Sequence, residues 1–359
     1  MVGFILKRIY YGIFVLMGVV TLVFILFTIL PGDPARMMLG QRADISSVEA
    51  INRELGRDQP LVIQYLAFVN DLSPVSWHNV ASPGSAWFPD SAKYAPFITL
   101  VSAGNARVLL KKPYLRRSYQ SKRKVSEILA QSFPNTMLLA TVAMGFAAIL
   151  GIFLGVVTAV KKGTWIDQLT TIISVLGMSL PSFFAAIIIA WLFAFVLADY
   201  TGLSMFGSLF TVDDFGHGEY LDLKNLILPA LTLGIRPLAI VIELTRSSML
   251  EVLSQDYIRT AKAKGLGFNR IIYRHALRNA LNPVVTAISG WFASLMAGAV
   301  FVEYIFDWKG IGVVIVDGLE KYDFPVVMGS VLFIAVLLVI INIFVDIIYG
   351  LLDPRIRLT

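Results

Sequence analysis

Residues 251–283 read EVLSQDYIRTAKAKGLGFNRIIYRHALRNALNP, a polar and basic stretch between two long apolar segments. Two short helical patterns flank Gly265-Leu266-Gly267, and Pro283 opens the next apolar run. The stretch carries too many charges to cross a bilayer, and its pattern is too regular for an irregular loop. We therefore expect a helical hairpin on the cytoplasmic face of a membrane protein, where it would contact a separate protein.

The composition of the chain is that of an integral membrane protein. Of its 359 residues, 57% are hydrophobic and 15% are charged, whereas about 25% of residues are charged in soluble domains. A helix needs roughly 20 apolar residues to cross the hydrocarbon core of a bilayer. The sequence therefore predicts an all-α membrane protein with six transmembrane helices. Their approximate ranges are Ile9–Leu30, Pro134–Val160, Leu169–Leu197, Leu226–Met249, Leu281–Phe301 and Val326–Leu352.

Basic residues in the short loops predict the orientation, because Lys and Arg are retained in the cytoplasm. With six spans, the basic clusters all fall on one side: Lys7 and Arg8, Lys161 and Lys162, the basic residues from Arg246 to Arg278, and Arg355 and Arg357. The short loops 198–225 and 302–325 on the other side are acidic. The first run is longer than a signal-peptide core and has no small-x-small cleavage site, so we expect an uncleaved span. We predict a multi-pass membrane protein with both termini in the cytoplasm.

Four parts are expected along the chain. They are residues 1–30 with the first span, an extracellular or periplasmic subdomain at 31–133, a five-helix core at 134–352 that includes the cytoplasmic loop 250–280, and a cytoplasmic tail at 353–359. The subdomain is basic, yet a loop of this length translocates largely regardless of its charge. An amphipathic pattern at Ser47–Leu66 predicts a helix, and the proline-rich residues 73–114 are expected to be irregular.

Several kinds of chemistry are excluded by residues that the chain lacks. It has no cysteine, which excludes disulfides, iron–sulfur clusters and thiolate zinc sites. Its three histidines, His78, His217 and His275, do not have metal-ligand spacing, so no metal site is predicted. No GxxxxGK[ST] phosphate loop is present, and no catalytic cluster argues for an enzyme. The net charge of +6 comes largely from loops beside apolar runs, so it does not indicate nucleic-acid binding.

Ionisable residues inside the apolar runs are candidate functional residues, because an unpaired charge at mid-bilayer costs about 3 kcal/mol or more. Arg236 and Glu243 in the fourth run are two helical turns apart and share one face. One hypothesis places both on a translocation pathway; in the other, Arg236 extends to the interface and Glu243 pairs with a neighbouring span. For Asn342 and Asp346 in the sixth run, hydrogen bonding to another span is favoured over a proton relay.

Small residues and prolines predict where the spans pack and bend. Gly151 and Gly155, like Ala293 and Ala297, are spaced for close helix approach. Packing within one subunit is favoured for them, although an interface between subunits stays open. Pro181 and Pro237 are expected to interrupt the third and fourth spans.

Specific motifs carry a family resemblance over nearly the whole chain. The text Tyr257-Ile258-Arg259-Thr260-Ala261-Lys262-Ala263-Lys264-Gly265-Leu266, then His275-Ala276-Leu277-Arg278-Asn279-Ala280 and Pro283, resembles the cytoplasmic EAA loop of ABC importer permeases. It looks most like the dipeptide/oligopeptide/nickel permease family. Further similar motifs are LPGDP at 30–34, LGRDQP at 55–60, SLPSFF at 179–184, LPALTLG at 228–234 and DPRIR at 353–357. Residues 73–114 look like an insertion that the family usually lacks, and Glu243 stands where relatives often have a basic residue.

The resemblance implies a permease subunit of an ATP-driven importer in the bacterial inner membrane. Its implied partners are a second homologous permease subunit, two ABC ATPase subunits, an extracellular substrate-binding protein and membrane lipids, with no nucleic acid. The chain itself would bind no cofactor, because ATP and Mg would be used by the partner ATPases. In the family, the short helix before the loop glycine fits a groove in the ATPase. The coupling residues carried over are Asp256, Tyr257, Arg259, Thr260, Ala261, Ala263, Lys264 and Gly265.

Elementary chemistry adds detail to this coupling helix, which is expected at about Asp256–Lys264. Asp256 is expected to cap its N-terminus by accepting from the first free amides. Ala261 and Ala263 would keep its surface small for close packing. Gly265 and Gly267 would allow positive φ at the turn.

Other function classes and several substrates stay open on the sequence. A self-contained secondary transporter or channel is the alternative, although no internal repeat supports it. A membrane-embedded enzyme would need a catalytic cluster, which is not evident. Dipeptides, longer peptides, nickel chelates and some sugars all use similar permeases. The sequence also leaves open whether residues 73–114 dock the binding protein.

Overall fold

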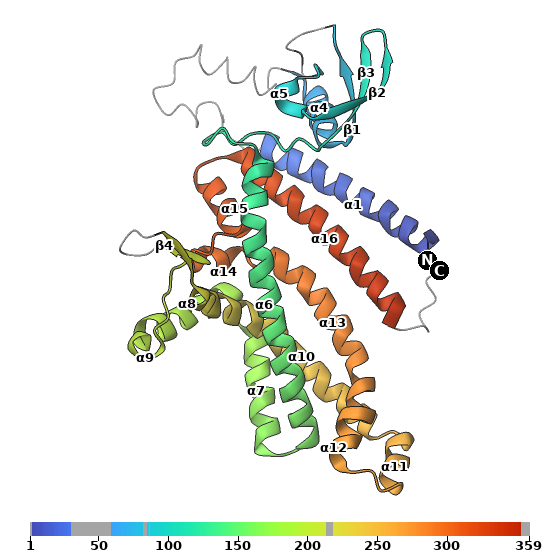
Figure 1. Cartoon of the computed structure of the whole chain (residues 1–359), viewed down its shortest axis with the longest axis vertical. Coiled ribbons are helices and arrows are strands. Elements are labelled where there is room, and N and C mark those ends of the chain that lie inside the picture. Colours follow the sequence, from blue (N-terminus) through green and yellow to red (C-terminus); the bar gives the residue numbers. More distant parts are fainter. Residues whose placement is uncertain (1, 30–58, 82–84, 86, 213–217, 353–359) are drawn as a thin grey trace. The chain divides into compact units, whose positions relative to one another are not determined.

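A computed structural model describes residues 2–29, 59–81, 85, 87–212 and 218–352, and its helices and strands are labelled in Figure 1. The chain forms two compact units. The first unit comprises Met1–Ile9, Ser132–Val313 and Leu337–Thr359, and the second comprises Tyr10–Gln131 and Val314–Val336. The helix predicted at Ser47–Leu66 lies mostly outside the described residues, as does the tail at 353–359.

Five described helices are long and apolar enough to cross a membrane, and a bent pair makes a sixth if it is counted as one span. The five helices are α1 (Val2–Ile29), α6 (Val125–Val160), α10 (Ile227–Leu253), α13 (Leu277–Gly298) and α16 (Phe324–Leu352). The bent pair is α7 (Trp165–Ser179) and α8 (Ser182–Trp191). These elements confirm a mostly helical membrane fold, as predicted for the spans.

The prolines affect the helices differently. The pair α7 and α8 bends by 113° at Leu180 and Pro181, both of which have extended backbone angles. A proline disfavours the helical conformation of the residue before it, which explains this break. Pro237, in contrast, lies inside the continuous helix α10, so the predicted interruption there is wrong. Helix α6 also begins at Val125 and includes Pro134, earlier than the apolar run predicted.

The core of the first unit is a packed cluster from α6, α8, α10, α13 and the short helix α14 (Val300–Ile305). Close approach of α6 to α10 depends on two glycines. A Cβ at Gly151 would lie 2.7 Å from Val241 Cγ1, and one at Gly155 would lie 2.5 Å from Thr245 Cβ. The glycine pair therefore packs within this chain, as was favoured from the sequence.

A helical hairpin follows α13, and its first part, up to Val313, belongs to the first unit. It runs from α14 through a turn at 306–310 into α15 (Ile311–Glu320). The fully buried Glu303 carboxylate accepts the Gly312 amide hydrogen at 2.6 Å, at the start of α15. The indole of Trp308 donates to the Asn135 carbonyl of α6 at 2.9 Å, and Ile311 donates its amide to Thr136 Oγ1 at 2.9 Å. These bonds hold the turn against α6.

The second unit contains a small β-sheet, which corrects the expectation that residues 73–114 are irregular. Strands β1 (Val75–Asn79), β3 (Ala106–Lys111) and β2 (Phe97–Ala103) form an antiparallel sheet in that order. The short alternation of β1, with Ser76 and His78 buried and Val75 and Trp77 exposed, was hidden by the surrounding prolines. The described part of the subdomain is therefore mixed rather than wholly helical.

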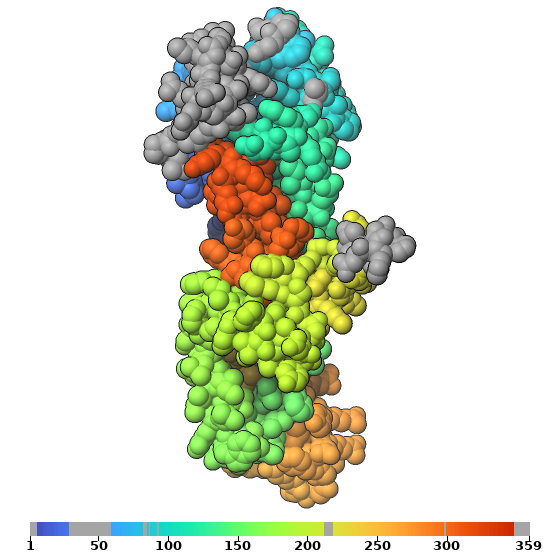
Figure 2. Space-filling view, turned by 90° about the vertical axis from the view of Figure 1, so that its left-hand side faces the viewer, coloured from blue at the N-terminus to red at the C-terminus, as the bar shows by residue number. Residues whose placement is uncertain are grey.

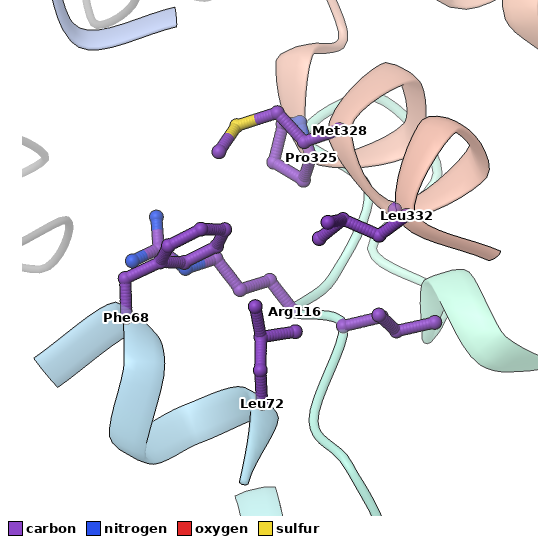
Figure 3. Close-up of a pocket in the computed structure, with 8 residues that line it drawn as sticks. Phe68, Leu72, Arg116, Pro325, Met328 and Leu332 are labelled. Carbon is purple, nitrogen blue, oxygen red and sulfur yellow. The ribbon is translucent and has the colours of Figure 1, made fainter. Parts of the chain in front are cut away.

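Helix α4 (Leu61–Leu72) completes the core of the second unit by packing against α1 and α16 through Phe68, Val23 and Leu332. Figure 3 shows a small pocket beside α4, where the Arg116 guanidinium lies 5.2 Å from the Phe68 ring centroid. Apart from the short helices between α10 and α13, the remaining described elements are α5 (Ser91–Tyr94), α9 (Ala198–Thr201), the hairpin β4 (Phe210–Val212) and β5 (Glu219–Leu221), and short helical turns at Leu192–Val196 and Leu223–Leu226.

Candidate functional site

The candidate site is the helix α11 (Asp256–Ala263), which follows α10 and precedes α12 (Phe268–Arg270). Figure 1 shows α11 and α12 projecting beyond the ends of α10 and α13 in the first unit. A π-helical turn at Ile271–Ala276 then leads directly into α13. The two short helices predicted around Gly265-Leu266-Gly267 are therefore confirmed, and each is joined to a long helix.

The inner face of α11 is anchored in a small hydrophobic cluster. Ile258 is fully buried and Ala261 is nearly so. The cluster beneath them is formed by α6, α10, the π-helical turn and α13, through Val156, Ala159, Met249, Ile271, Ile272, Ala276 and Ala280. Full burial of an isoleucine side chain is worth about 2 kcal/mol, which favours a fixed position for the helix. A force on α11 would thus reach α10 and α13.

The outer face of α11 is polar and open. The exposed residues of α11 and its C-cap are Asp256, Tyr257, Arg259, Thr260, Lys262, Ala263 and Lys264. The Tyr257 hydroxyl accepts a hydrogen bond from Asn279 Nδ2 of α13 at 2.8 Å, which links the two helices. Most of the residues carried over as coupling residues therefore lie together on one accessible face.

A left-handed residue ends the helix. Gly265 has a φ of +73°, and its amide donates to the Lys262 carbonyl at 2.9 Å. Glycine adopts this conformation without the steric cost that a Cβ imposes. Positive φ at Gly265 is thus as predicted. The same prediction for Gly267 is wrong, since its φ is −65°.

Two other expectations about α11 need correction. Asp256 is the first helical residue rather than the cap, which is Gln255, and the Asp256 carboxylate lies 3.4 Å from Arg259. Ala261 faces the interior of this chain, so it does not keep the outer surface small. Its buried position follows from the helical period, which places it three residues after Ile258 on one face.

An ion pair holds the end of α10, just before the loop that contains α11. It was not predicted from the sequence. Asp167 at the start of α7 accepts two hydrogen bonds from Arg246 of α10, at 2.6 and 3.0 Å. The Gly163 amide also donates to the same carboxylate, at 2.9 Å. Arg246 is close to the end of α10, from which α11 continues, so this pair holds the α6–α7 turn against that end. The acidic residue in the first turn of α7 was the available sequence signal.

Arg236 and Glu243 lie on a face of α10 that the other described residues cover only in part. Arg236 is exposed and its guanidinium carbon lies 6.0 Å from the Trp291 ring centroid on α13. Glu243 is partly exposed and forms no ion pair within the residues that the structure describes. Asp346, in contrast, forms an ion pair at 2.9 Å with Arg8 of α1, which favours the structural role over the proton relay.

Comparison with known proteins gives consistent matches. The family described as binding-protein-dependent transport system inner membrane component matches residues 151–358, and its N-terminal counterpart matches residues 1–85. The di/tripeptide transport system permease protein DppB of Pseudomonas aeruginosa is 36% identical over 375 residues, covering 99% of both chains. The glutathione transport system permease protein GsiC of Pectobacterium atrosepticum is 34% identical over 357 residues, again covering 99% of both chains.

A solved structure supports the fold. A chain of the MetNI methionine ABC transporter, in an inward-facing conformation, matches 64% of this chain and 97% of its own length. The TM-score is 0.51 and the sequence identity is 16%. At this identity the match concerns the arrangement of the helices.

Proposed function

The chain belongs to the family of binding-protein-dependent transport system inner membrane components, and on this premise we propose how its cytoplasmic loop works. The protein is a multi-pass inner-membrane permease subunit of an ABC importer, and not an enzyme. In our proposal, the outer face of α11 docks into an ATPase subunit. Motion of the ATPase then reaches α10 and α13 through the buried base of α11.

The observation that carries this proposal is the two-sided character of α11. One side is fixed in the cluster around Ile258, and the other presents exposed polar side chains. The bend at Gly265 and the bond between Tyr257 and Asn279 support the transfer of motion into α13.

The assembly that we propose has four further members. They are a second permease subunit, two ATPase subunits that use ATP and Mg, and a substrate-binding protein on the opposite side of the membrane. This chain binds no cofactor of its own in the proposal. Both termini and α11 lie in the cytoplasm, because the basic clusters flank those segments. Residues 31–133 then form the subdomain outside the membrane, and 134–352 form the core.

Peptides are the proposed substrate class. Relatives of about equal similarity are described as permeases for dipeptides, for di- and tripeptides and for glutathione, which is itself a small peptide. All of them align over 99% of this chain. We infer a short peptide as the cargo here.

Transport in proteoliposomes tests the proposal against its alternative, a self-contained secondary transporter or channel. The chain is reconstituted with its partner permease and ATPases, and the binding protein and a labelled tripeptide are supplied at the opposite face. We expect uptake only with hydrolysable ATP and all partners. Uptake by this chain alone, driven by an ion gradient, would establish the alternative.

A further inference from the structure

The long helices of this protein differ in how many large apolar side chains they expose. Helices α1, α7 and α16 present many large apolar side chains, such as Phe14, Ile173 and Phe344. Helices α7 and α8, light green to yellow-green, lie on the surface seen in Figure 2. Among the described residues of 228–256 and 274–300, which include most of α10 and α13, no large hydrophobic side chain is exposed. Exposed apolar side chains favour contact with lipid. We therefore infer that the open sides of α10 and α13 do not face lipid.

On α10, the open face is polar and charged. Arg236 and Ser247 are exposed and Glu243 is partly exposed. At about 100° per residue, these three positions fall within a narrow arc of the helix. Most residues on the opposite side, including Val241, Thr245 and Met249, are buried.

On α13, the open face carries small and polar residues. Asn282, Thr286, Gly290 and Ser294 are exposed and repeat at a spacing of four. The side chain of Thr286 also donates to the Asn282 carbonyl at 3.0 Å, within the helix itself. A spacing of four keeps the residues on one side of a helix.

The two open faces adjoin. Helices α10 and α13 pack along one another, and the Arg236 guanidinium carbon lies 6.0 Å from the ring centroid of Trp291, the residue after Gly290. We call the combined surface the polar face. It consists of Arg236, Glu243, Ser247, Asn282, Thr286, Gly290 and Ser294.

A charge in hydrocarbon costs about 3 kcal/mol or more unless it is compensated. Neither Arg236 nor Glu243 forms an ion pair among the described residues. Glu243 interacts electrostatically with Arg246, which is itself paired with Asp167. We propose that the polar face lines the translocation pathway and recognises short zwitterionic peptides, Arg236 through their carboxylate and Glu243 through their ammonium group. The proposal rests on the importer function given above. It extends that function by naming a site within this chain and the charge pattern of its cargo.

The distance between Arg236 and Glu243 along α10 is similar to the length of an extended tripeptide. Seven helical residues correspond to about 10.5 Å along the axis of α10. An extended chain spans about 3.3–3.6 Å per residue, so the termini of a tripeptide are separated by about 10 Å. A guanidinium group also forms two parallel hydrogen bonds with a carboxylate, which favours Arg236 as the partner of the C-terminus. The small residues of α13 leave room for variable peptide side chains.

The absence of cysteine from the chain allows a direct test of the surface. Single cysteines are introduced at Ser247, Thr286 and Ser294, with Ile173→Cys and Phe344→Cys as controls on apolar exposed positions. The assembled transporter in membranes is treated with a charged, membrane-impermeant thiol reagent from either side. We expect labelling of the first three positions and slowing of that labelling by a saturating tripeptide. If the three positions label no faster than the controls, the polar face is a subunit or lipid contact and the proposal is overturned.

Uptake kinetics test the two charged residues. Arg236→Gln and Glu243→Gln are expected to lower the maximal rate of tripeptide uptake by about tenfold or more, as for a lost charge-assisted hydrogen bond. Arg236→Lys should recover part of the rate because it keeps the charge. The matched control is Glu127→Gln, which removes an exposed carboxylate from the first turn of α6. The ATPase rate stimulated by the binding protein should remain near wild type in all of them, which excludes loss of coupling as the cause.

The outcomes separate the two proposals. If the wild-type assembly takes up no peptide, the proposed substrate class is wrong. If the wild type takes up peptide and neither charge-neutralising variant changes the kinetics, the importer function stands and the polar-face assignment is wrong.

Discussion

The carboxylate of Asp167 and the guanidinium of Arg246 form a bidentate ion pair, with Nε 2.6 Å from Oδ1 and a terminal nitrogen 3.0 Å from Oδ2. The pair joins the start of α7 to the end of α10, from which α11 continues. Both side chains are largely buried, with 6% of the Asp167 side chain and 22% of the Arg246 side chain exposed. We call this pair the brace, because it holds the start of α7 against the end of α10 that leads into α11.

Removing one partner of this brace should destabilise the protein. Asp167→Ala leaves a largely buried guanidinium without its partner, and we expect a loss of about 3 kcal/mol or more. The measurement is the apparent melting temperature of the purified protein in detergent. The control is Asp256→Ala, which removes a carboxylate that is 94% exposed and 3.4 Å from Arg259; its effect should stay below about 1 kcal/mol. Equal melting temperatures for the two variants would contradict the brace.

A substitution at Gly265 should impair coupling without preventing folding. Valine at this position must adopt positive φ, which costs about 1–2 kcal/mol or more and distorts the end of α11. We expect Gly265→Val to reduce the amount of ATPase that co-purifies and to lower uptake. Gly267→Val is the control, because Gly267 has negative φ and open space around it. Undiminished ATPase recovery with normal uptake in Gly265→Val would argue against the coupling role.

Close packing of α6 on α10 predicts that even one methyl group at Gly155 is harmful. A Cβ there would lie 2.8 Å from the Ile242 carbonyl oxygen, so the helices must move apart. We expect Gly155→Ala to cost about 1–3 kcal/mol, as overpacking does. At Gly145 of the same helix nothing lies within 4 Å, so Gly145→Ala should be neutral or slightly stabilising. Thermal unfolding of both variants checks this, and a loss at Gly145 equal to that at Gly155 would contradict it.

The buried carboxylate of Glu303 should make stability depend on pH. Burial raises its pKa from 4.5 to about 7, against the opposing effect of hydrogen bonds from Thr136 and Gly312. Between these two values the folded state holds more protons than the unfolded state, so stability falls as the pH rises through this range. We expect the melting temperature of the wild type to decline from about pH 5 to about pH 8. Glu303→Gln should lessen that decline, and an unchanged profile would show that Glu303 does not titrate there.

Much of the membrane architecture could be predicted from the sequence because it depends on local composition. The apolar runs predicted the long helices, Pro181 predicted the bend between α7 and α8, and Gly265 predicted a left-handed turn. Each of these rests on a property of one residue or one segment, namely hydrophobicity or backbone freedom. The family motifs in 251–283 then predicted that this loop is the coupling element, which stays a prediction.

The predictions that were wrong or missing concern features that depend on contacts between different segments of the chain. The sheet at 75–111 was missed because its strands are short and the segment between β1 and β2 contains Pro83, Pro89 and Pro96. Ala261 was expected on the outer surface, yet packing on the cluster beneath α11 turns it inward. The brace between Asp167 and Arg246 joins residues far apart in sequence, and no local pattern pairs them.

The sequence by itself determined that this chain crosses a membrane and carries a basic helical hairpin with a glycine bend, because hydrophobic length and charge are properties of segments. Only the tertiary structure decided which sides of α10 and α13 remain open, and it placed Arg236 of the polar face beside Trp291 of α13. The physical reason is that a helix has neighbours on several sides at once. Which side stays open depends on how the other helices pack, and that information is spread over the whole chain.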